Sequence, residues 1–294
     1  MTLRSEIADA LTAAGLDPAD VERVVRRALD EDLAFGPDVT TDSTVSPTAR
    51  STGDVVPRSA GVLAGIPVAA AVFDLVGGPA VDVVRHAADG SAAEPGRAVL
   101  TVTGPTRALL TAERTALNLV SQLSGVPTLT GRWVDVVAGT GAAIRDTRKT
   151  TPGLRALQKY AVRCGGGVNH RMGLGDAALI KDNHVAAAGG LTAAVEAVRR
   201  TAPGIPLEVE CDTIDQVKEA LTAGVQLLLL DNFGLEDTRA AVGMVRGTGV
   251  RLEASGGLDL GRAREVAATG VDYLAVGALT HSAPVLDLGF DLRD

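Results

Sequence analysis

The chain has 294 residues, a formal net charge of −8 and a sequence pI near 5.1. It contains one tryptophan, two tyrosines and four phenylalanines. This composition argues against a nucleic-acid-binding protein, which needs basic surface and, for single strands, aromatic stacking platforms. The N-terminus lacks the apolar core of a signal peptide and no apolar run reaches membrane-spanning length, so we expect a cytoplasmic protein without membrane contact. Two cysteines are too few for a disulfide framework or a zinc site.

The N-terminal third is predicted to form a small domain of helices and strands. Residues 3–33 place apolar side chains at helical spacing, with breaks at Gly15 and Pro18. From residue 40 to 106 the pattern changes to short β-like runs separated by Gly, Pro, Asp and Ser, with one helix expected near 67–76.

A longer helix is expected over residues 107–124. Its apolar stripe consists of Leu110, Leu117, Val120 and Leu123, and Arg114 lies beside that stripe. Taken alone, Arg114 is typical of a solvated helix residue.

From residue 142 onward, strand-like and helix-like segments alternate. The expected strands are 142–147, 177–182, 206–212, 225–231, 251–255 and 273–278. Strand–helix repeats with buried apolar strands indicate a parallel sheet, either doubly wound or curled into a barrel. Six strands, or seven if the glycine-rich segment 164–168 contains another, fall short of the eight in a complete barrel. The barrel is favoured, because residues capable of chemistry follow nearly every strand.

Positive charge is concentrated between Gly141 and His184. This segment has eight Arg and Lys residues against three Asp, a formal charge of +5 within a chain of −8. Cations this dense repel one another unless an anion joins them. The segment therefore predicts a pocket for a multiply anionic small molecule.

Acidic residues mark two of the later strands. Alternation along 206–212 places Glu208, Glu210 and Asp212 on one face, which then lines a polar lumen or binds a cation. Strand 225–231 ends in a further acid, Asp231. Three acids on one strand face are not compatible with a plain apolar core, and both interpretations stay open.

Small residues follow the last two strands. Ser255, Gly256 and Gly257 precede a helix, and Gly277 ends the final strand. Small residues ahead of a helix let backbone N–H groups approach a phosphate, and barrels commonly bind phosphate after their last two strands. A tight turn is the competing interpretation of Ser-Gly-Gly.

Several other residues have ordinary structural interpretations. Arg155 and Lys159, four residues apart on one helix, indicate a solvated face. His86, His184 and His281 show no partner pattern. Lys181 fits either an ion pair with a neighbouring strand's acid or a Schiff-base lysine of an aldolase.

Seven motifs together resemble the quinolinate phosphoribosyltransferase family. They are AERTALNLVSQLSG, DTRKTTPG, GGGVNHRMGLGDAALIKDNH, LEVE, LLLLDN and EASGG in the larger part, with EDLAFGPDVTTDSTV near the N-terminus. The resemblance implies an open seven-stranded α/β barrel, of the type II phosphoribosyltransferase kind, with an N-terminal α/β sandwich-like domain. The expected domains are 1–118, with the tail 283–294 packed back on it, and 119–282. A homodimer is also implied.

The resemblance further implies a pentosyltransferase of NAD biosynthesis that uses quinolinate, 5-phosphoribosyl 1-pyrophosphate and Mg²⁺. Substrate-binding residues would be Arg114 (from the partner subunit), Thr147, Arg148, Lys149, His170, Arg171, Lys181, Glu210, Asp231, Ser255, Gly256, Gly257, Val276, Gly277 and Ala278. Lys149, Lys181, Glu210 and Asp231 would be catalytic, and Glu210 with Asp231 would hold Mg²⁺, directly or indirectly.

Three alternatives stay open at this point. They are a phosphoribosyltransferase that does not decarboxylate its acid, a Schiff-base barrel aldolase using Lys181, and a non-catalytic phosphosugar-binding regulator. Release of carbon dioxide, trapping with borohydride, and binding without turnover distinguish them.

Overall fold

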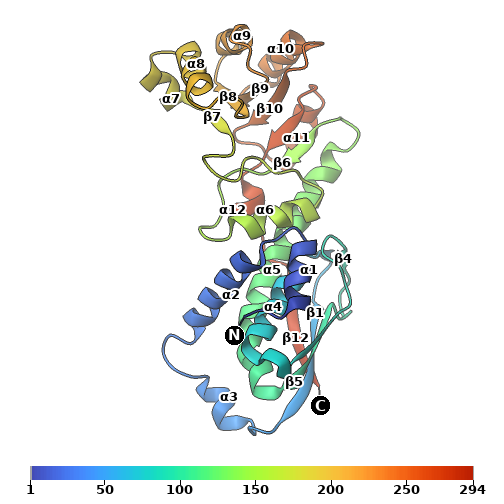
Figure 1. Ribbon diagram of the computed structural model, residues 1–294. Coiled ribbons are helices and arrows are strands. Elements are labelled where there is room, and N and C mark those ends of the chain that lie inside the picture. Colours follow the sequence, from blue (N-terminus) through green and yellow to red (C-terminus); the bar gives the residue numbers. More distant parts are fainter. Residues whose placement is uncertain (1, 294) are drawn as a thin grey trace. The chain divides into compact units, whose positions relative to one another are not determined.

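In the computed structural model, which describes residues 2–293, the chain forms two units with separate cores (Figure 1). The first comprises Met1–Gly131, Thr150–Gly166 and Leu279–Asp294, and the second comprises Arg132–Lys149 and Gly167–Ala278. The domain boundary expected at 118/119 falls inside one continuous helix, α5 (Thr106–Val137), which is longer than the predicted 107–124.

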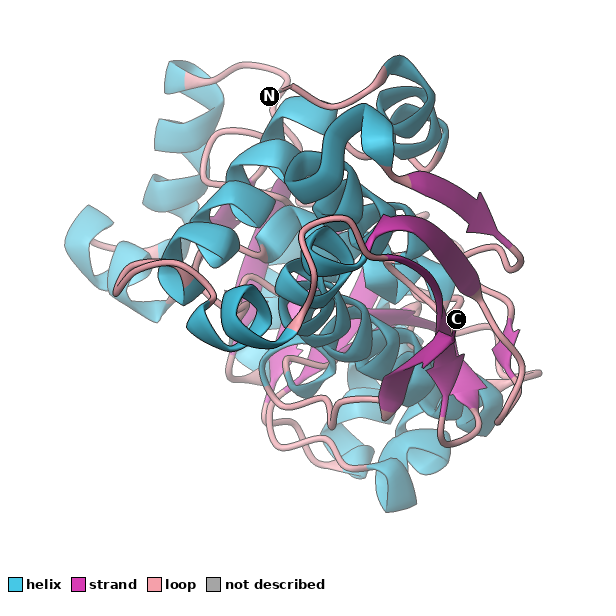
Figure 2. Cartoon of the chain, turned by 90° about the horizontal axis from the view of Figure 1, so that it is seen from below, coloured by secondary structure: helices cyan, strands magenta, loops and turns pink. Residues whose placement is uncertain are grey.

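The elements of the first unit are α1 (Ser5–Ala13), α2 (Pro18–Asp32), α3 (Val39–Thr44), β1 (Arg50–Pro57), β2 (Gly61–Val62), α4 (Ile66–Gly77), η1 (Gly78–Ala80), β3 (Asp82–Arg85), β4 (Ala92–Ala93), β5 (Leu100–Pro105), most of α5, α6 (Arg155–Cys164) and β12 (Leu288–Arg293). Its main sheet has the antiparallel order β12-β1-β5-β3, so the last strand of the chain pairs with the first. In Figure 2 the C-terminus accordingly lies beside strands drawn in magenta.

Helix α4 is the centre of the first unit. All its residues from Ile66 to Leu75 are buried, because it contacts α1 and α2 as well as strands β3 and β5. Phe73 on α4 stacks on Phe290 of β12, with 5.7 Å between ring centroids. Gly53 of β1 gives that ring its space, since a Cβ there would overlap Phe290. Helices and sheet thus enclose one apolar layer, as in an α/β sandwich.

The second unit alternates strands and helices. Its elements are β6 (Ala143–Arg145), β7 (Ala178–Ile180), α7 (Asp182–Ala188), α8 (Leu191–Thr201), β8 (Leu207–Cys211), α9 (Ile214–Thr222), β9 (Leu227–Asp231), α10 (Leu235–Val245), β10 (Arg251–Ser255), α11 (Leu260–Ala267) and β11 (Tyr273–Ala275); the short α12 (Ala278–His281) follows at the unit boundary. A capping box begins α9, with Thr213 and Gln216 each bonding the other's backbone N–H.

The six strands of this unit are parallel, in the order β6-β11-β10-β9-β8-β7. Helices α8 to α11 pack on the outer side of the sheet (Figure 1). Val168 adds a single parallel bridge beside Arg145 of β6, so the glycine-rich segment supplies one bridging residue in place of a full seventh strand. Within the described residues β6 and β7 are not paired, which leaves an open α/β barrel as expected.

Between residues 2 and 293, no helix combines the length and the apolar character needed to cross a membrane.

Candidate active site

A cavity of about 360 Å³ lies at the carboxyl ends of the barrel strands. Parallel strands bring these ends to one edge, so residues far apart in sequence converge there. The lining residues are Thr147, Arg148, Lys149, His170, Arg171, Leu179, Lys181, Glu210, Leu229, Asp231, Glu253, Ser255 and Ala275. Nine of the predicted site residues are among these thirteen.

Two arginines make the cavity attractive to anions. The Nε atoms of Arg148 and Arg171 are both buried and have no hydrogen-bond partner within the described chain. Burial, followed by the charge of Arg148, lowers the pKa of Arg171 from its ordinary value. An anionic ligand would satisfy both donors and relieve the repulsion between the two guanidinium groups.

Asp146 holds the segment that carries Arg171. This fully buried carboxylate accepts the backbone N–H of His170 at 2.8 Å and also the side-chain amide of Asn169. Backbone bonds between Val168 and the β6 strand support the same segment. Asp146 was not among the predicted site residues, although its charge near the end of the predicted strand 142–147, in the cationic region, was a usable signal.

The acids at the cavity rim have defined partners. Glu210 forms an ion pair with Lys181, and the Asp231 carboxylate accepts a hydrogen bond from Asn232 Nδ2 at 2.7 Å. Asn232 adopts a left-handed conformation, with φ of 56°, and its N–H bonds the carbonyl of Ser255. A non-glycine residue in this conformation is costly and often marks a functional site. The Lys181 ion pair uses an ammonium group, whereas Schiff-base chemistry needs a neutral amine.

The expected phosphate-binding residues are only partly in the main cavity. Ser255 lines it and also an adjoining hollow of about 30 Å³ that contains Gly256 and Gly257. Val276, Gly277 and Ala278 are not among the residues lining the main cavity, where Ala275 represents the end of β11. They continue directly from β11, which pairs with β10 ahead of the Ser-Gly-Gly turn.

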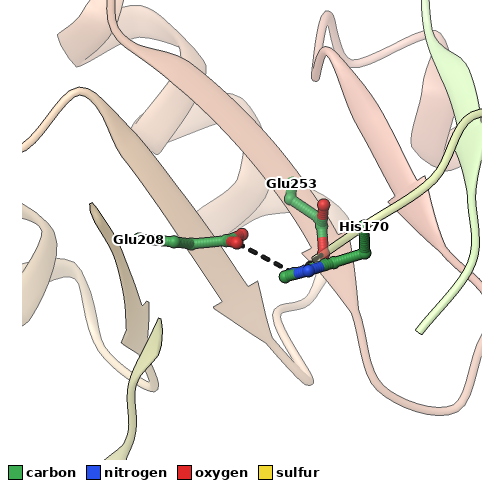
Figure 3. A group of neighbouring side chains, drawn as sticks. All are labelled: His170, Glu208 and Glu253. Carbon is green, nitrogen blue, oxygen red and sulfur yellow. Dashed lines mark ion pairs between the residues drawn. The ribbon is translucent and has the colours of Figure 1, made fainter. Parts of the chain in front are cut away.

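A charged cluster that was not predicted lies inside the barrel (Figure 3). Glu208, Glu253 and His170 are buried, with their ligand-type atoms within 4.8 Å of one another. Arg145 joins them through its Nη1, which lies 2.6 Å from Glu253 Oε2. The predicted polar lumen is therefore correct for Glu208, while Asp212 of the same face is exposed beyond the strand end.

The other residues noted in the sequence differ in outcome. Lys159 is fully buried and Arg155 is half-buried with its Nε bonded to Thr150, so the prediction of a solvated face was wrong. Arg114 is exposed on α5, within the first unit. His184 has a local structural role, since its Nδ1 accepts the Lys181 N–H at the start of α7.

Comparison with known proteins identifies the family. The family model "Quinolinate phosphoribosyl transferase, N-terminal domain" matches residues 38–124, and that of the C-terminal domain matches residues 126–291. The chain is 56% identical to the nicotinate-nucleotide pyrophosphorylase [carboxylating] of Mycobacterium leprae, over 91% of this chain and 95% of that protein.

Solved structures show the same relationship. The nicotinate-nucleotide pyrophosphorylase from Francisella tularensis superposes with a TM-score of 0.89 at 37% identity, covering 94% of this chain and 96% of that one. Human nicotinic acid phosphoribosyltransferase shares the fold alone, with a TM-score of 0.60 at 15% identity over 87% of this chain and 72% of that one. The chain therefore belongs to the quinolinate phosphoribosyl transferase family.

Proposed function

We propose that this protein transfers the phosphoribosyl group of 5-phosphoribosyl 1-pyrophosphate to quinolinate. Loss of carbon dioxide then gives nicotinate mononucleotide, with pyrophosphate as the other product, in the de novo synthesis of NAD. The observation that carries this proposal is one cavity lined both by arginines with buried, unsatisfied Nε donors and by the carboxylates of Glu210 and Asp231, in a chain 56% identical to a carboxylating nicotinate-nucleotide pyrophosphorylase.

Quinolinate binds through its two carboxylates. Arg148 and Arg171 offer buried, unsatisfied Nε donors, and an arginine fork matches two carboxylate oxygens at once. Each charge-assisted contact contributes about 1.5–3 kcal/mol, so two arginines and Lys181 suffice to hold a small dianion. The same groups orient the ring nitrogen toward the sugar.

The sugar phosphate lies on the opposite, acidic side of the cavity. Lys149 and Lys181 meet its anionic groups, and Glu210 and Asp231 face the ribose. Departure of pyrophosphate from ribose C1 develops positive charge, which a nearby carboxylate stabilises. The 5′-phosphate is held by the backbone of Ser255 to Gly257 together with Val276, Gly277 and Ala278, since these small residues let N–H groups approach.

Mg²⁺ is part of the proposal, with Glu210 and Asp231 as its protein ligands, directly or through water. The donor set fits, because both are carboxylates on the cavity wall and Mg²⁺ prefers oxygen. Asp231 uses one acceptor position for Asn232 and keeps others available. When bound, Mg²⁺ neutralises charge on the leaving pyrophosphate.

Decarboxylation follows from the alkylated ring. A pyridine nitrogen bonded to ribose carries positive charge, which stabilises the electron pair left on the neighbouring ring carbon when its bond to the carboxylate breaks and carbon dioxide leaves. A proton from solvent then adds to that carbon and gives nicotinate mononucleotide. The protein holds this carboxylate and limits water in the cavity.

A homodimer with a shared site completes the proposal, with Arg114 of the partner subunit as a further quinolinate ligand. The exposure of Arg114 on α5 supports this assignment, because an arginine that reaches another subunit must be accessible in the single chain. A cytoplasmic location is also proposed, supported by two cysteines that are both unpaired.

One assay tests the function against its alternatives. Purified protein is mixed with carboxyl-labelled quinolinate, 5-phosphoribosyl 1-pyrophosphate and Mg²⁺, and labelled carbon dioxide and nicotinate mononucleotide are quantified. Equal amounts of both are expected. Nucleotide formation from an acid without carbon dioxide release would indicate a non-decarboxylating transferase. Borohydride trapping of a carbonyl substrate on Lys181 would indicate an aldolase, and ligand binding without turnover a regulator.

A further inference from the structure

The buried cluster beneath the cavity has a defined geometry. Strand β8 contributes Glu208 and strand β10 contributes Glu253, and both side chains point toward His170 (Figure 3). Arg145 of strand β6 contacts the two glutamates. His170 Nε2 lies 2.9 Å from Glu208 Oε2 and 3.7 Å from Glu253 Oε1. The side chains of the two glutamates are 4% and 0% exposed, so these contacts form away from solvent.

The hydrogen bonds of His170 determine its tautomer. Its Nδ1 accepts the backbone N–H of Arg171 at 2.7 Å and therefore carries no proton. The proton of the neutral ring is then on Nε2, which donates to Glu208. A nitrogen that carries a proton cannot ligate a metal ion, so this geometry disfavours a metal at the His170, Glu208 and Glu253 group.

Both ring nitrogens of His170 are thus directed at protein groups. One bonds the backbone of Arg171, and Arg171 continues with its Nη1 on the carbonyl of Ala177 at 2.9 Å and an unsatisfied Nε. The chain of contacts runs from Glu208 through the imidazole to the backbone of the arginine that lines the cavity. A substitution of Glu208 therefore affects the substrate indirectly, through His170 and Arg171.

Charge balance explains why Glu208 keeps its place. Arg145 pairs closely with Glu253 and is 3.9 Å from Glu208. One guanidinium cannot neutralise two ionised carboxylates, and each glutamate has one buried oxygen, Oε1, without a partner. Burial, and then the charge of Glu208, raises the pKa of Glu253 to about 7. One proton shared between the carboxyl groups of Glu208 and Glu253 makes the net charge of these two residues and Arg145 zero. A buried group of side chains without net charge has the lowest desolvation free energy.

We propose that Glu208 is a positioning residue for the acid-binding side of the cavity, acting on Arg171 through the Nε2–H of His170. It does not touch substrate, and the Arg145 guanidinium, 3.9 Å away, helps to hold it in place. His170 then acts as the link between Glu208 and Arg171. This inference rests on the proposed function for the identity of the acid.

Two substitutions separate positioning from a general structural role. In Glu208→Gln the amide oxygen still accepts the His170 proton, whereas Glu208→Met has similar size and no acceptor at that position. Either change leaves Arg145 and Glu253 as a balanced pair, so folding is retained. Glu196→Met, at an exposed position of α8, is the matched control.

The first readout needs no substrate. Long-range ¹H–¹⁵N spectra at pH 8 report which ring nitrogen of each of the four histidines is protonated, and a His170→Asn variant assigns the signal. His170 should be in the Nε2–H form in all four proteins, because its Nδ1 accepts the Arg171 N–H. The Nε2 proton should exchange slowly with solvent in the wild type, in Glu208→Gln and in the control, and faster in Glu208→Met, which has no acceptor for it. Addition of Zn²⁺ should leave this signal unchanged.

The second readout is kinetic. The KM for quinolinate should rise about tenfold or more in Glu208→Met and less than threefold in Glu208→Gln, with the KM for 5-phosphoribosyl 1-pyrophosphate nearly constant, as expected for loss of one charge-assisted contact. A slowly exchanging Nε2 proton and a wild-type KM in a folded Glu208→Met variant would overturn the proposal, as would Zn²⁺ binding at His170. Absence of quinolinate turnover in the wild type would refute the proposed function instead, and the spectra would still test the contact.

Discussion

Replacing Glu253 by Gln should change how the stability of the barrel unit depends on pH. Glu253 is fully buried on β10, and its pKa is raised from 4.5 to about 7 by burial and by Glu208, against the opposing effects of Arg145 and His170. Between these two values the unfolded chain has released this proton and the folded chain has kept it. Stability contributed by the protonated group is therefore complete below pH 4.5 and lost as pH rises toward 7.

The size of the effect follows from the shift. A difference of about 2.5 units at about 1.4 kcal/mol per unit makes about 3–4 kcal/mol in the free energy of unfolding. The protein has a pI near 5.1 and is least soluble there, so measurements should begin at pH 5.5. Between pH 5.5 and 8 the remaining part is about 2 kcal/mol. Glu253→Gln cannot titrate and should not show this loss.

Urea unfolding followed by tryptophan fluorescence measures the free energy of unfolding of the barrel unit, to which Glu253 belongs. The single tryptophan, Trp133, is buried and belongs to the second unit, as does Glu253. The free energy of Glu253→Gln minus that of the wild type should become more positive by about 2 kcal/mol from pH 5.5 to 8. The same difference for the exposed control Glu196→Gln should stay constant. A constant difference for Glu253→Gln as well would refute the buried, protonated carboxyl.

Three further predictions concern the reaction. Quinolinate should exceed nicotinate in kcat/KM by on the order of 10³-fold, because nicotinate leaves a buried arginine unpaired; equal values for the two acids would contradict the site. Glu210→Gln and Asp231→Asn should each lower kcat by about 10²–10³-fold and leave the affinity for quinolinate almost unchanged. Steady-state kinetics measures kcat and calorimetry measures the affinity; a lower affinity at normal kcat would exclude their role toward the sugar. Arg114→Ala and Arg148→Ala should be nearly inactive as separate homodimers, whereas their co-expression should restore about a quarter of the wild-type sites; background activity in verified heterodimers would rule out a shared site.

The sequence was sufficient to predict which strand ends meet. The alternation of strand-like and helix-like segments identified β10 with the same limits, 251–255, that the structure has. Parallel pairing then brings Ser255 opposite Asp231, as the register confirms. Residues at the ends of such strands must share one rim, whatever their distance along the chain. For this reason the sequence alone could assign Lys181, Glu210 and Asp231 to one cavity.

Burial of individual helix residues was harder to predict. Arg155 and Lys159 are four residues apart on α6, a spacing that usually marks a solvated face. Lys159 is nevertheless fully buried, while Arg155 is only half-buried. Spacing indicates that two side chains share a helix face, but what covers that face depends on segments distant in sequence. The spacing of residues along one helix does not reveal which distant segments pack against it.

The two acids of β8 show the same limit inside the barrel. Alternation correctly placed Glu208 and Glu210 on the lumen face, but it could not distinguish their chemistry. Two residues along a strand correspond to about 7 Å. At that separation Glu210 reaches the rim and pairs with Lys181, while Glu208 stays in the buried interior with His170. Depth in the barrel is set by how neighbouring strands are staggered, which is a property of the closed sheet and not of one strand's sequence. The stagger therefore decides which acid can act on a substrate and which can only position the residues that do.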